Sequence, residues 1–321
     1  MNEKILAFGE ILLRLSAADE TIRDSRSFFA CYGGTESNVL ACLASLGHRT
    51  EYLTALPDND LGKAALAHLN RLGIDTSHVL TDGDTMGMYF TENGTASRGA
   101  NVVYARRHSA FTHLDENSFP FDSVFDGVKL FHISGISFAL SESSCALAFR
   151  LIDEAKKRHI PVSFDFNFRP ALWTAEKALP KLRRAALQAD ILLASHRDLD
   201  TFMATDEENA FDAYPCKYLV LRDRTVISSD KHSVSVTLMN RDGTKTAIRD
   251  FSFPVTDKIG GGDAFDGALL HGLLCGRMSD AESLRFATAA FALKHTVPGD
   301  VLSVTENEII QFMNKTEGLL P

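Results

Sequence analysis

The chain has 321 residues, of which 45% are hydrophobic and 23% charged, a balance typical of a globular protein. Its net charge of −9 argues against a nucleic-acid-binding surface but leaves room for a local basic patch that binds a small anion. The five scattered cysteines include no C-x-x-C pair, which disfavours a structural zinc site and suits a reducing compartment. There is no signal peptide pattern, and no apolar run approaches the ~20 residues that span a bilayer. We therefore expect a cytoplasmic protein without membrane or nucleic-acid partners.

Strand-like segments alternate with segments of helical spacing along most of the chain. In chain order the predicted elements are strand 5–8, helix 37–46, strand 52–56, helix 61–72, strand 128–133, helix 144–158, strand 162–166, helix 178–188 and strand 191–194. This alternation predicts an α/β fold with a mostly parallel sheet covered by helices. Ligands bind such sheets beyond the carboxyl ends of the strands, where Gly33, Asp165 and Ser195 fall.

Two polar, glycine-containing stretches interrupt this alternation, at about residues 12–32 and 86–104. Both show local period-2 patterning, as in Gly87–Thr91, and we interpret them as a small β lid inserted into the larger body. The alternative is a pair of surface hairpins. A lid would exclude water during group transfer. Because the chain shows no internal repeat or Pro-rich linker, we expect one domain over residues 1–321.

The most informative motif runs from Asp257 to Gly267, with the sequence DKIGGGDAFDG. Three glycines, 260–262, lead directly into Asp263 and an apolar helical pattern. Glycines at a helix start let backbone N–H groups turn toward one point, where the helix dipole also favours an anion. The Asp263 carboxylate could then deprotonate a hydroxyl beside a bound phosphoryl group. The alternative reading of Asp263 is an ordinary helix cap.

A second motif, GGTESN, spans residues 33–38. Its paired glycines allow close backbone approach, and Asn38 offers a donor and an acceptor to sugar hydroxyls. Taken alone, the motif is better explained as a simple turn before a helix. Together with the glycine motif at 260–262 and the turn at 57–62, it resembles the signatures of the ribokinase-like (phosphofructokinase B type) carbohydrate kinases. The resemblance covers essentially the whole chain, in the expected order.

This resemblance implies an ATP-dependent, Mg²⁺-requiring sugar kinase built as a three-layer α/β/α sandwich with a β lid. It makes Asp263 the base and gives the anion hole to Gly260, Gly261 and Gly262. The sugar would lie against Gly33, Gly34 and Asn38. The residues that it assigns to the nucleotide are Ser195, Leu221, Arg222, Gly260, Gly262 and Lys294.

Three departures from the family pattern concern the nucleotide and metal. The usual Asn-x-x-Glu is Ser195-His-Arg-Asp198 here, which leaves Asp198 as the candidate Mg²⁺ ligand. The usual Thr-x-Gly-x-x-Gly turn is replaced by residues 221–225 without glycine, and the usual Asp-Thr by Asp257-Lys258. Whether a monovalent cation such as K⁺ assists stays open.

Residues 87–90, 103–110, 165–173 and 292–300 resemble the 2-keto-3-deoxygluconate kinases more closely. A sugar carboxylate calls for arginine and tyrosyl hydroxyl partners, and arginine presents the better fork. The residues carried over by position are Tyr89, Tyr104, Arg106 and Arg169. The alternative for both arginines is a surface cation or an ordinary ion pair.

The expected function is phosphorylation of the terminal hydroxyl of a sugar acid, with 2-keto-3-deoxygluconate as the first candidate. A neutral sugar such as fructose, or another ketodeoxy-hexonate such as the galactonate, is the second possibility. The third is a non-catalytic sugar- or nucleotide-binding regulator, motivated by Ser195 and Asp198. The lid strands also offer a surface for a homo-oligomer.

Overall fold

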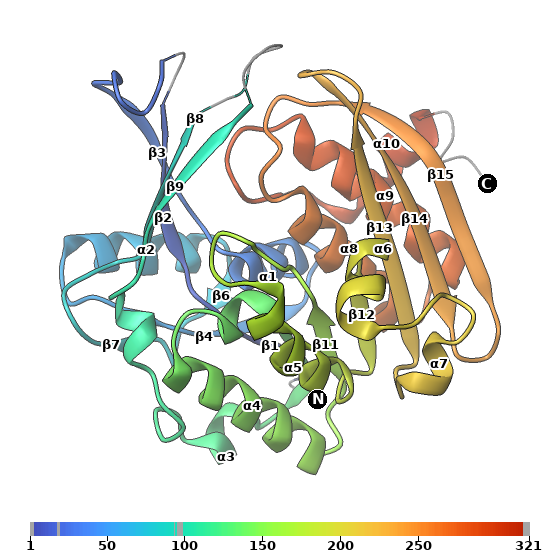
Figure 1. Cartoon of the computed structure of the whole chain (residues 1–321), viewed down its shortest axis with the longest axis horizontal. Coiled ribbons are helices and arrows are strands. Elements are labelled where there is room, and N and C mark those ends of the chain that lie inside the picture. The colour runs from blue at the N-terminus through green and yellow to red at the C-terminus, as the bar shows by residue number, and fades with distance from the viewer. Residues whose placement is uncertain (1–2, 18–19, 93, 95–98, 317–321) are drawn as a thin grey trace.

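The computed structural model describes residues 3–17, 20–92, 94 and 99–316, and its centre is a nine-stranded sheet (Figure 1). Neighbouring strands are parallel except at one end, where β13, β14 and β15 pair antiparallel. In spatial order the strands are β15 (Lys245–Pro254), β14 (Lys231–Asn240), β13 (Tyr218–Val226), β12 (Ile191–Ala194), β11 (Val162–Asp165), β10 (Val128–Ser134), β1 (Lys4–Phe8), β4 (Arg49–Leu53) and β6 (Ile74–Asp75).

Helices cover both faces of this sheet (Figure 1). The longer ones are α1 (Thr35–Ser45), α2 (Asp60–Arg71), α4 (Glu142–Lys157), α5 (Ala175–Ala186), α8 (Gly261–Cys275), α9 (Asp280–His295) and α10 (Glu306–Lys315). The short ones are α3 (Phe121–Val124), α6 (His196–Asp198), α7 (Ala210–Ala213), η1 (Ala110–His113), η2 (Gly135–Phe138) and η3 (Leu199–Met203).

Period-2 alternation in the central strands builds a core on each face. In β12, Leu192 packs with the cluster under α4 and α5, whereas Leu193 packs with the cluster under α8 and α9. Both side chains are almost fully buried. The central strands thus bury the side chains that point to either face of the sheet, as a sheet covered on two sides requires. The predicted three-layer α/β/α sandwich is confirmed.

Most predicted elements match the structure to within three residues, but the strand expected over residues 52–56 is two strands. β4 ends at Leu53, and Ala55–Leu56 form β5, which pairs with β7 (Leu80–Thr81) in a separate two-stranded sheet. The chain leaves the main sheet at Thr54, whose carbonyl accepts from the Leu80 N–H at 3.0 Å. A continuous apolar run gave no sign of this change of partner.

A second, four-stranded sheet stands beyond the carboxyl ends of the parallel strands (Figure 1). Its order is β3 (Phe28–Gly33), β2 (Leu12–Ala17), β8 (Met88–Glu92) and β9 (Asn101–Ala105). The strands therefore come from both stretches that interrupt the α/β alternation, and we refer to them together as the lid sheet. β2 pairs parallel with β8, while the two outer pairs are antiparallel. Within the described part of the chain, no helix is long and apolar enough to cross a bilayer.

Candidate active site

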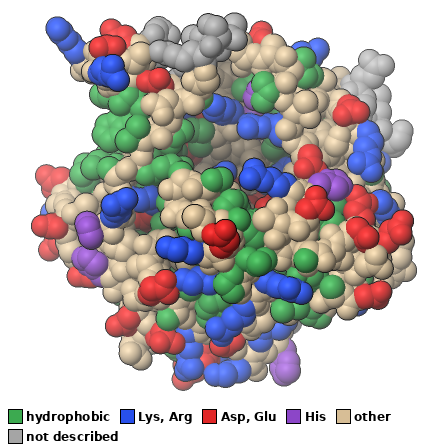
Figure 2. Space-filling view, viewed as in Figure 1, with side chains coloured by type: hydrophobic (Ala, Val, Ile, Leu, Met, Phe, Trp, Pro, Cys, Tyr) green, Lys and Arg blue, Asp and Glu red, His purple; other side chains and the backbone are tan. Residues whose placement is uncertain are grey.

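A cavity of about 530 Å³ lies between the lid sheet and the carboxyl ends of the central strands. Figure 2 shows the hollow from outside, with basic side chains around it. The candidate residues that line it are Gly33, Gly34, Asn38, Tyr89, Tyr104, Arg106, Arg169, Ser195, Asp198, Arg222, Gly260, Gly262 and Asp263. The fold thus brings both glycine motifs, more than 200 residues apart, to one cavity.

The first turn of α8 forms one wall, and close packing explains its glycines. Gly260 is the N-cap, with a left-handed φ of +79°, and a Cβ there would lie 1.8 Å from the Asp300 carbonyl oxygen. A Cβ on Gly261 would lie 2.1 Å from the His295 ring. Because first-turn N–H groups have no intrahelical acceptors, this turn presents donors and the positive end of the helix dipole. Such a turn suits a phosphoryl oxygen.

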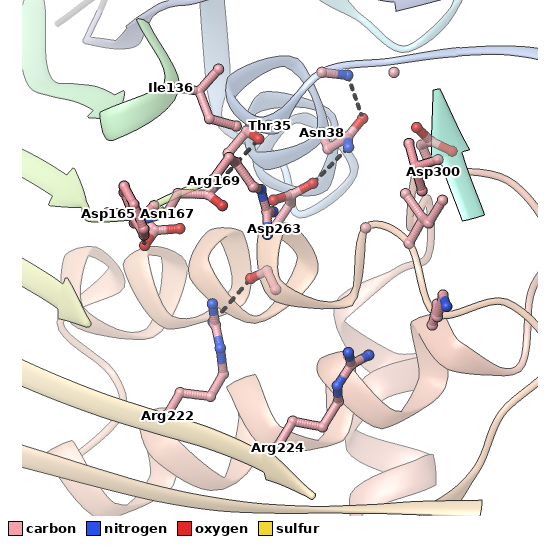
Figure 3. Close-up of a pocket in the computed structure, with 18 of the residues that line it drawn as sticks. Thr35, Asn38, Ile136, Asp165, Asn167, Arg169, Arg222, Arg224, Asp263 and Asp300 are labelled. Carbon is pink, nitrogen blue, oxygen red and sulfur yellow. Dashed lines mark hydrogen bonds between the residues drawn. The ribbon is translucent and has the colours of Figure 1, made fainter. Parts of the chain in front are cut away.

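Asp263 lies in the same turn and faces the cavity beside Asn38 and Arg169 (Figure 3). The Asn38 Nδ2 donates to Asp263 Oδ2 at 2.6 Å, while Asn38 Oδ1 accepts from the Gly34 N–H at 3.3 Å. Burial raises the pKa of Asp263 to about 7, although the Asn38 hydrogen bond opposes the shift. A carboxyl group with this pKa is suited to accept a proton near neutral pH. Asn38, expected against the sugar, here also orients this carboxylate.

The lid sheet is fastened to this wall by a buried ion-pair network that the sequence did not suggest. Arg14 Nη1, from β2, lies 2.8 Å from Asp257 Oδ2 and 2.8 Å from Asp300 Oδ1. Tyr89, from β8, donates its hydroxyl to Asp300 Oδ2 at 2.5 Å. Burial lowers the pKa of Arg14, but the two carboxylates outweigh this effect and raise it. The one usable signal was a lone arginine in the apolar run 12–15.

Asp257 also holds together the two loops that meet at the start of α8. Its Oδ1 accepts from the Ile259 N–H at 3.1 Å, and its Oδ2 accepts from the Gly299 N–H at 3.0 Å. Since Oδ2 is also the partner of Arg14, a single carboxylate connects β2, the glycine turn and the loop before Asp300. Lid position and glycine-turn geometry are therefore mechanically linked.

The two candidate arginines on the sugar side of the cavity differ in whether their charge is already paired within the protein. Arg106 is buried and forms an ion pair with Glu10, with Nε 2.7 Å from Oε2. Arg169 is exposed within the cavity, and Figure 3 shows it reaching toward Asp263. Tyr89 and Tyr104 stack, with ring centroids 5.9 Å apart. Arg169 is therefore the better placed of the two arginines to meet a ligand carboxylate, because the charge of Arg106 is already balanced.

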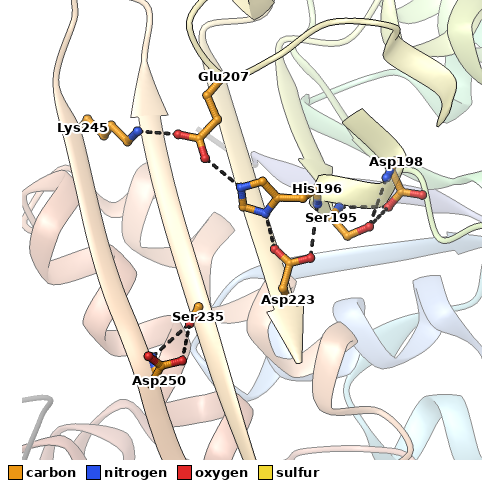
Figure 4. Close-up of polar contacts among 8 residues, drawn as sticks. All are labelled: Ser195, His196, Asp198, Glu207, Asp223, Ser235, Lys245 and Asp250. Atoms are coloured by element: carbon orange, nitrogen blue, oxygen red, sulfur yellow. Dashed lines mark hydrogen bonds and ion pairs between the residues drawn. The ribbon is translucent and has the colours of Figure 1, made fainter. Parts of the chain in front are cut away.

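Ser195 and Asp198 cap α6 and reach the cavity from its other side. Ser195 Oγ donates to Asp198 Oδ2 at 2.7 Å, and the Ser195 N–H donates to the same oxygen at 2.9 Å. The adjoining His196 contacts Asp223 and Glu207, and Glu207 also pairs with Lys245 (Figure 4). This network ties α6 to β13 and β15.

Three candidate residues do not line the cavity. Leu221 is fully buried in β13, and the buried Lys294 donates its ammonium to the Val297 carbonyl at 3.0 Å. Gly261 packs against His295. The structure therefore does not bring the side chains of Leu221 and Lys294 to a ligand. Among the described residues, no group of three or more His, Cys, Asp or Glu side chains could hold a metal ion.

The glycine turn, the adjoining carboxylate and the α/β/α body define a kinase for small molecules, and comparison with known proteins agrees. Residues 2–307 match the model of the pfkB family carbohydrate kinases, and the chain belongs to this family.

Individual relatives cover nearly the whole chain. A 2-dehydro-3-deoxygalactonokinase of Haloferax volcanii is 31% identical, covering 96% of both chains. The solved pfkB family carbohydrate kinase of Listeria grayi is 34% identical with a TM-score of 0.92, covering 97% of this chain and 99% of that one. The 2-dehydro-3-deoxygluconokinase of Thermotoga maritima is 32% identical, also with a TM-score of 0.92, covering 96% and 98%.

Arg14→Met should destabilise the protein by ~3–5 kcal/mol, because it leaves the buried Asp300 carboxylate and the half-buried Asp257 carboxylate without their cation. Urea unfolding followed by circular dichroism measures the change in free energy. The control is Lys63→Met, since Lys63 pairs with Asp60 on the exposed face of α2 and should leave the unfolding midpoint in place. Equal midpoints for the wild type and Arg14→Met would contradict the role of the network.

Proposed function

We propose that this carbohydrate kinase transfers the γ-phosphoryl group of ATP to the terminal hydroxyl of a sugar acid, first of all 2-keto-3-deoxygluconate. The observation that carries the proposal is the position of Asp263, which lies in the glycine turn that presents unpaired N–H donors. Asp263 accepts the hydroxyl proton, and the turn at residues 260–262 holds the transferring phosphoryl group. The two tasks meet within a single helical turn, as in-line transfer requires.

The sugar side of the cavity supports an acidic substrate. Gly33 and Gly34 allow close backbone approach, while Tyr89 and Tyr104 supply a stacked wall with hydroxyl groups. Arg169 is the proposed partner of the substrate carboxylate, and Arg106 is proposed as a second residue beside the substrate. The name of the Thermotoga maritima structure supports the gluconate as substrate. The Haloferax volcanii relative favours 2-keto-3-deoxygalactonate as the second candidate.

ATP would lie toward Ser195 and Arg222, on the opposite side of Asp263 from the lid sheet. Asp198 is the proposed protein contact of Mg²⁺, because one of its oxygens caps α6 and the other stays available. Such a site is completed by substrate phosphates and water, which suits the lack of a protein-only metal cluster among the described side chains. Bound Mg²⁺ would neutralise phosphate charge. We further propose that the reaction takes place in the cytoplasm, where ATP is available, and that K⁺ is a candidate activator.

We also propose that the lid sheet pairs with that of a second copy. Strand register places Leu15, Phe28, Phe90 and Val103 on the face away from the cavity. Val103 is 46% exposed and the other three are half-buried, and Figure 2 shows hydrophobic side chains gathered over this region. A sheet that met only water there would carry polar residues.

The oligomer proposal predicts a mass of at least two chains in multi-angle light scattering. Val103→Asp should reduce this mass to one chain, because it places a charge in the apolar face. Its matched control is Val226→Asp, which introduces the same charge at a side chain 62% exposed in β13, outside the lid sheet. A monomeric wild type would end the proposal.

The base assignment predicts that kcat/KM rises about tenfold per pH unit up to a pH of about 7 and is level above it, because only ionised Asp263 accepts the proton. Asp263→Asn should lose on the order of 10³-fold in kcat while binding sugar and ATP nearly as well. Steady-state assays from pH 5 to 9 and calorimetric titration test both points. Near-normal turnover by Asp263→Asn would refute the assignment.

The substrate assignment is tested by ADP release on a panel of acidic and neutral sugars. The wild type should prefer the ketodeoxy-hexonates, and Arg169→Gln should lose about 10–100-fold in kcat/KM for them alone. Arg169 also lowers the pKa of Asp263, so the comparison is made at pH 8.5, where Asp263 is ionised in both proteins. Arg107→Gln, at an exposed neighbour of Arg106, is the control. Preference for fructose in the wild type would transfer the assignment to a neutral sugar.

A further inference from the structure

Asp266 is a fully buried carboxylate one turn after Asp263 on α8, and nothing above assigns it a role. Its Oδ1 accepts from Arg222 Nη1 at 2.6 Å. The same Nη1 donates to the carbonyl of Gly262 at 3.1 Å, the contact drawn in Figure 3. One guanidinium nitrogen therefore joins Asp266 to a glycine of the proposed anion hole.

Packing fixes this guanidinium in place. The Arg222 side chain extends from β13 across α8, with its guanidinium carbon 4.8 Å from the centre of the Phe265 ring and 5.9 Å from that of Phe291. A Cβ on Gly262 would lie 2.9 Å from Arg222 Nη2, so the glycine and the arginine are fitted to one another. Without Asp266, this half-buried guanidinium would lose its ion-pair partner.

We propose that Asp266 is a positioning residue for phosphoryl transfer, which holds Arg222 against the first turn of α8 and so fixes both the anion hole and the Asp263 carboxylate. The proposal rests on the proposed kinase function and deepens it. It also gives Arg222 a second role, because the arginine stabilises the start of α8 in addition to its proposed contact with the nucleotide.

A second carboxyl group completes the arrangement. Among the described residues, Asp266 Oδ2 is buried without a hydrogen-bond donor. Asp165, which lines the cavity at the end of β11, has a pKa well above its usual range because of burial and the nearby charge of Asp266. A protonated Asp165 supplies the donor that Oδ2 lacks. The pair then carries one negative charge, opposite the single positive charge of Arg222.

This charge pattern acts on Asp263. Besides burial and the Asn38 hydrogen bond, the pKa of Asp263 responds chiefly to Asp266, which raises it, and to Arg169 and Arg222, which lower it. The Lys294 ammonium on α9 also interacts with Asp263. Toward the core, Asp266 faces Cys42 of α1 and His132 of β10; burial and the carboxylate raise the pKa of Cys42, whereas burial lowers that of His132. Removing Asp266 and removing Arg222 should therefore shift the protonation of Asp263 in opposite directions.

The experiment compares Asp266→Asn, Arg222→Gln and Arg222→Lys with the wild type, using kcat and both KM values from pH 5 to 9. The acid limb of kcat/KM should move down by on the order of one pH unit in Asp266→Asn and up by a similar amount in Arg222→Gln. Arg222→Lys keeps the positive charge but lacks the planar set of guanidinium N–H donors. The acid limb of its kcat/KM profile should therefore stay at the wild-type pH, while kcat falls at least ~10-fold. Glu142→Gln, at an exposed ion pair with Lys181, is the control.

The outcomes separate the two hypotheses. A wild type that phosphorylates no sugar defeats the proposed function itself. An active wild type with kcat within twofold in Arg222→Lys and Asp266→Asn overturns the positioning role, as does a rise in the KM for ATP with kcat unchanged. Limbs that move in the same direction also overturn it. If Asp165 ionises in Asp266→Asn and replaces the lost charge, the double variant Asp165→Asn/Asp266→Asn should restore the downward shift of the acid limb. If Asp266→Asn does not fold, the two Arg222 variants test the positioning role.

Discussion

The left-handed turn at Gly260 is the constraint on which the rest of the site depends. It ends an irregular loop and starts α8 so that the first N–H groups face the cavity, with no room for side chains at this turn. Asp300, His295 and Arg222 crowd the three glycines from different elements. The positive end of the helix therefore meets the carboxyl ends of the parallel strands across one cavity. Every other group in the site is placed relative to this turn.

Three aspartates that lie close together differ in pKa and in ion pairing because their surroundings differ. Asp263 has a pKa near the pH of the cell, Asp165 has one well above its usual range, and Asp266 is an ion-pair partner of Arg222. The same type of side chain is thus suited to accept a proton, to donate one or to act as a fixed counter-charge, according to its surroundings. Arg169 and Arg222 offset the negative charge of this cluster of acids, which would otherwise repel a phosphate.

Local sequence signals were enough for the α/β alternation, the two lid stretches and both glycine motifs, because each element can be recognised from neighbouring residues alone. The antiparallel strands β13–β15 went unpredicted, although Val234, Val236 and Leu238 alternate with polar residues. The pairing of Arg14 with Asp300 was missed because it spans 286 positions, and nothing in the sequence around either residue identifies the other as its partner. Lys294 was assigned to the nucleotide by position alone, whereas its ammonium closes a turn inside the protein. Long-range ion pairs and side-chain direction were therefore the limits of the prediction.

The pairing of Arg14 with Asp300 has a consequence for how the protein is made. An emerging chain exposes β2 early, whereas Asp300 follows 286 positions after Arg14. Until Asp257 and Asp300 have both been added, the Arg14 guanidinium lacks one or both of its carboxylate partners, and the lid sheet lacks the ion pairs that hold it. The nascent protein therefore cannot fasten the lid sheet fully to the start of α8 until residue 300 has been added.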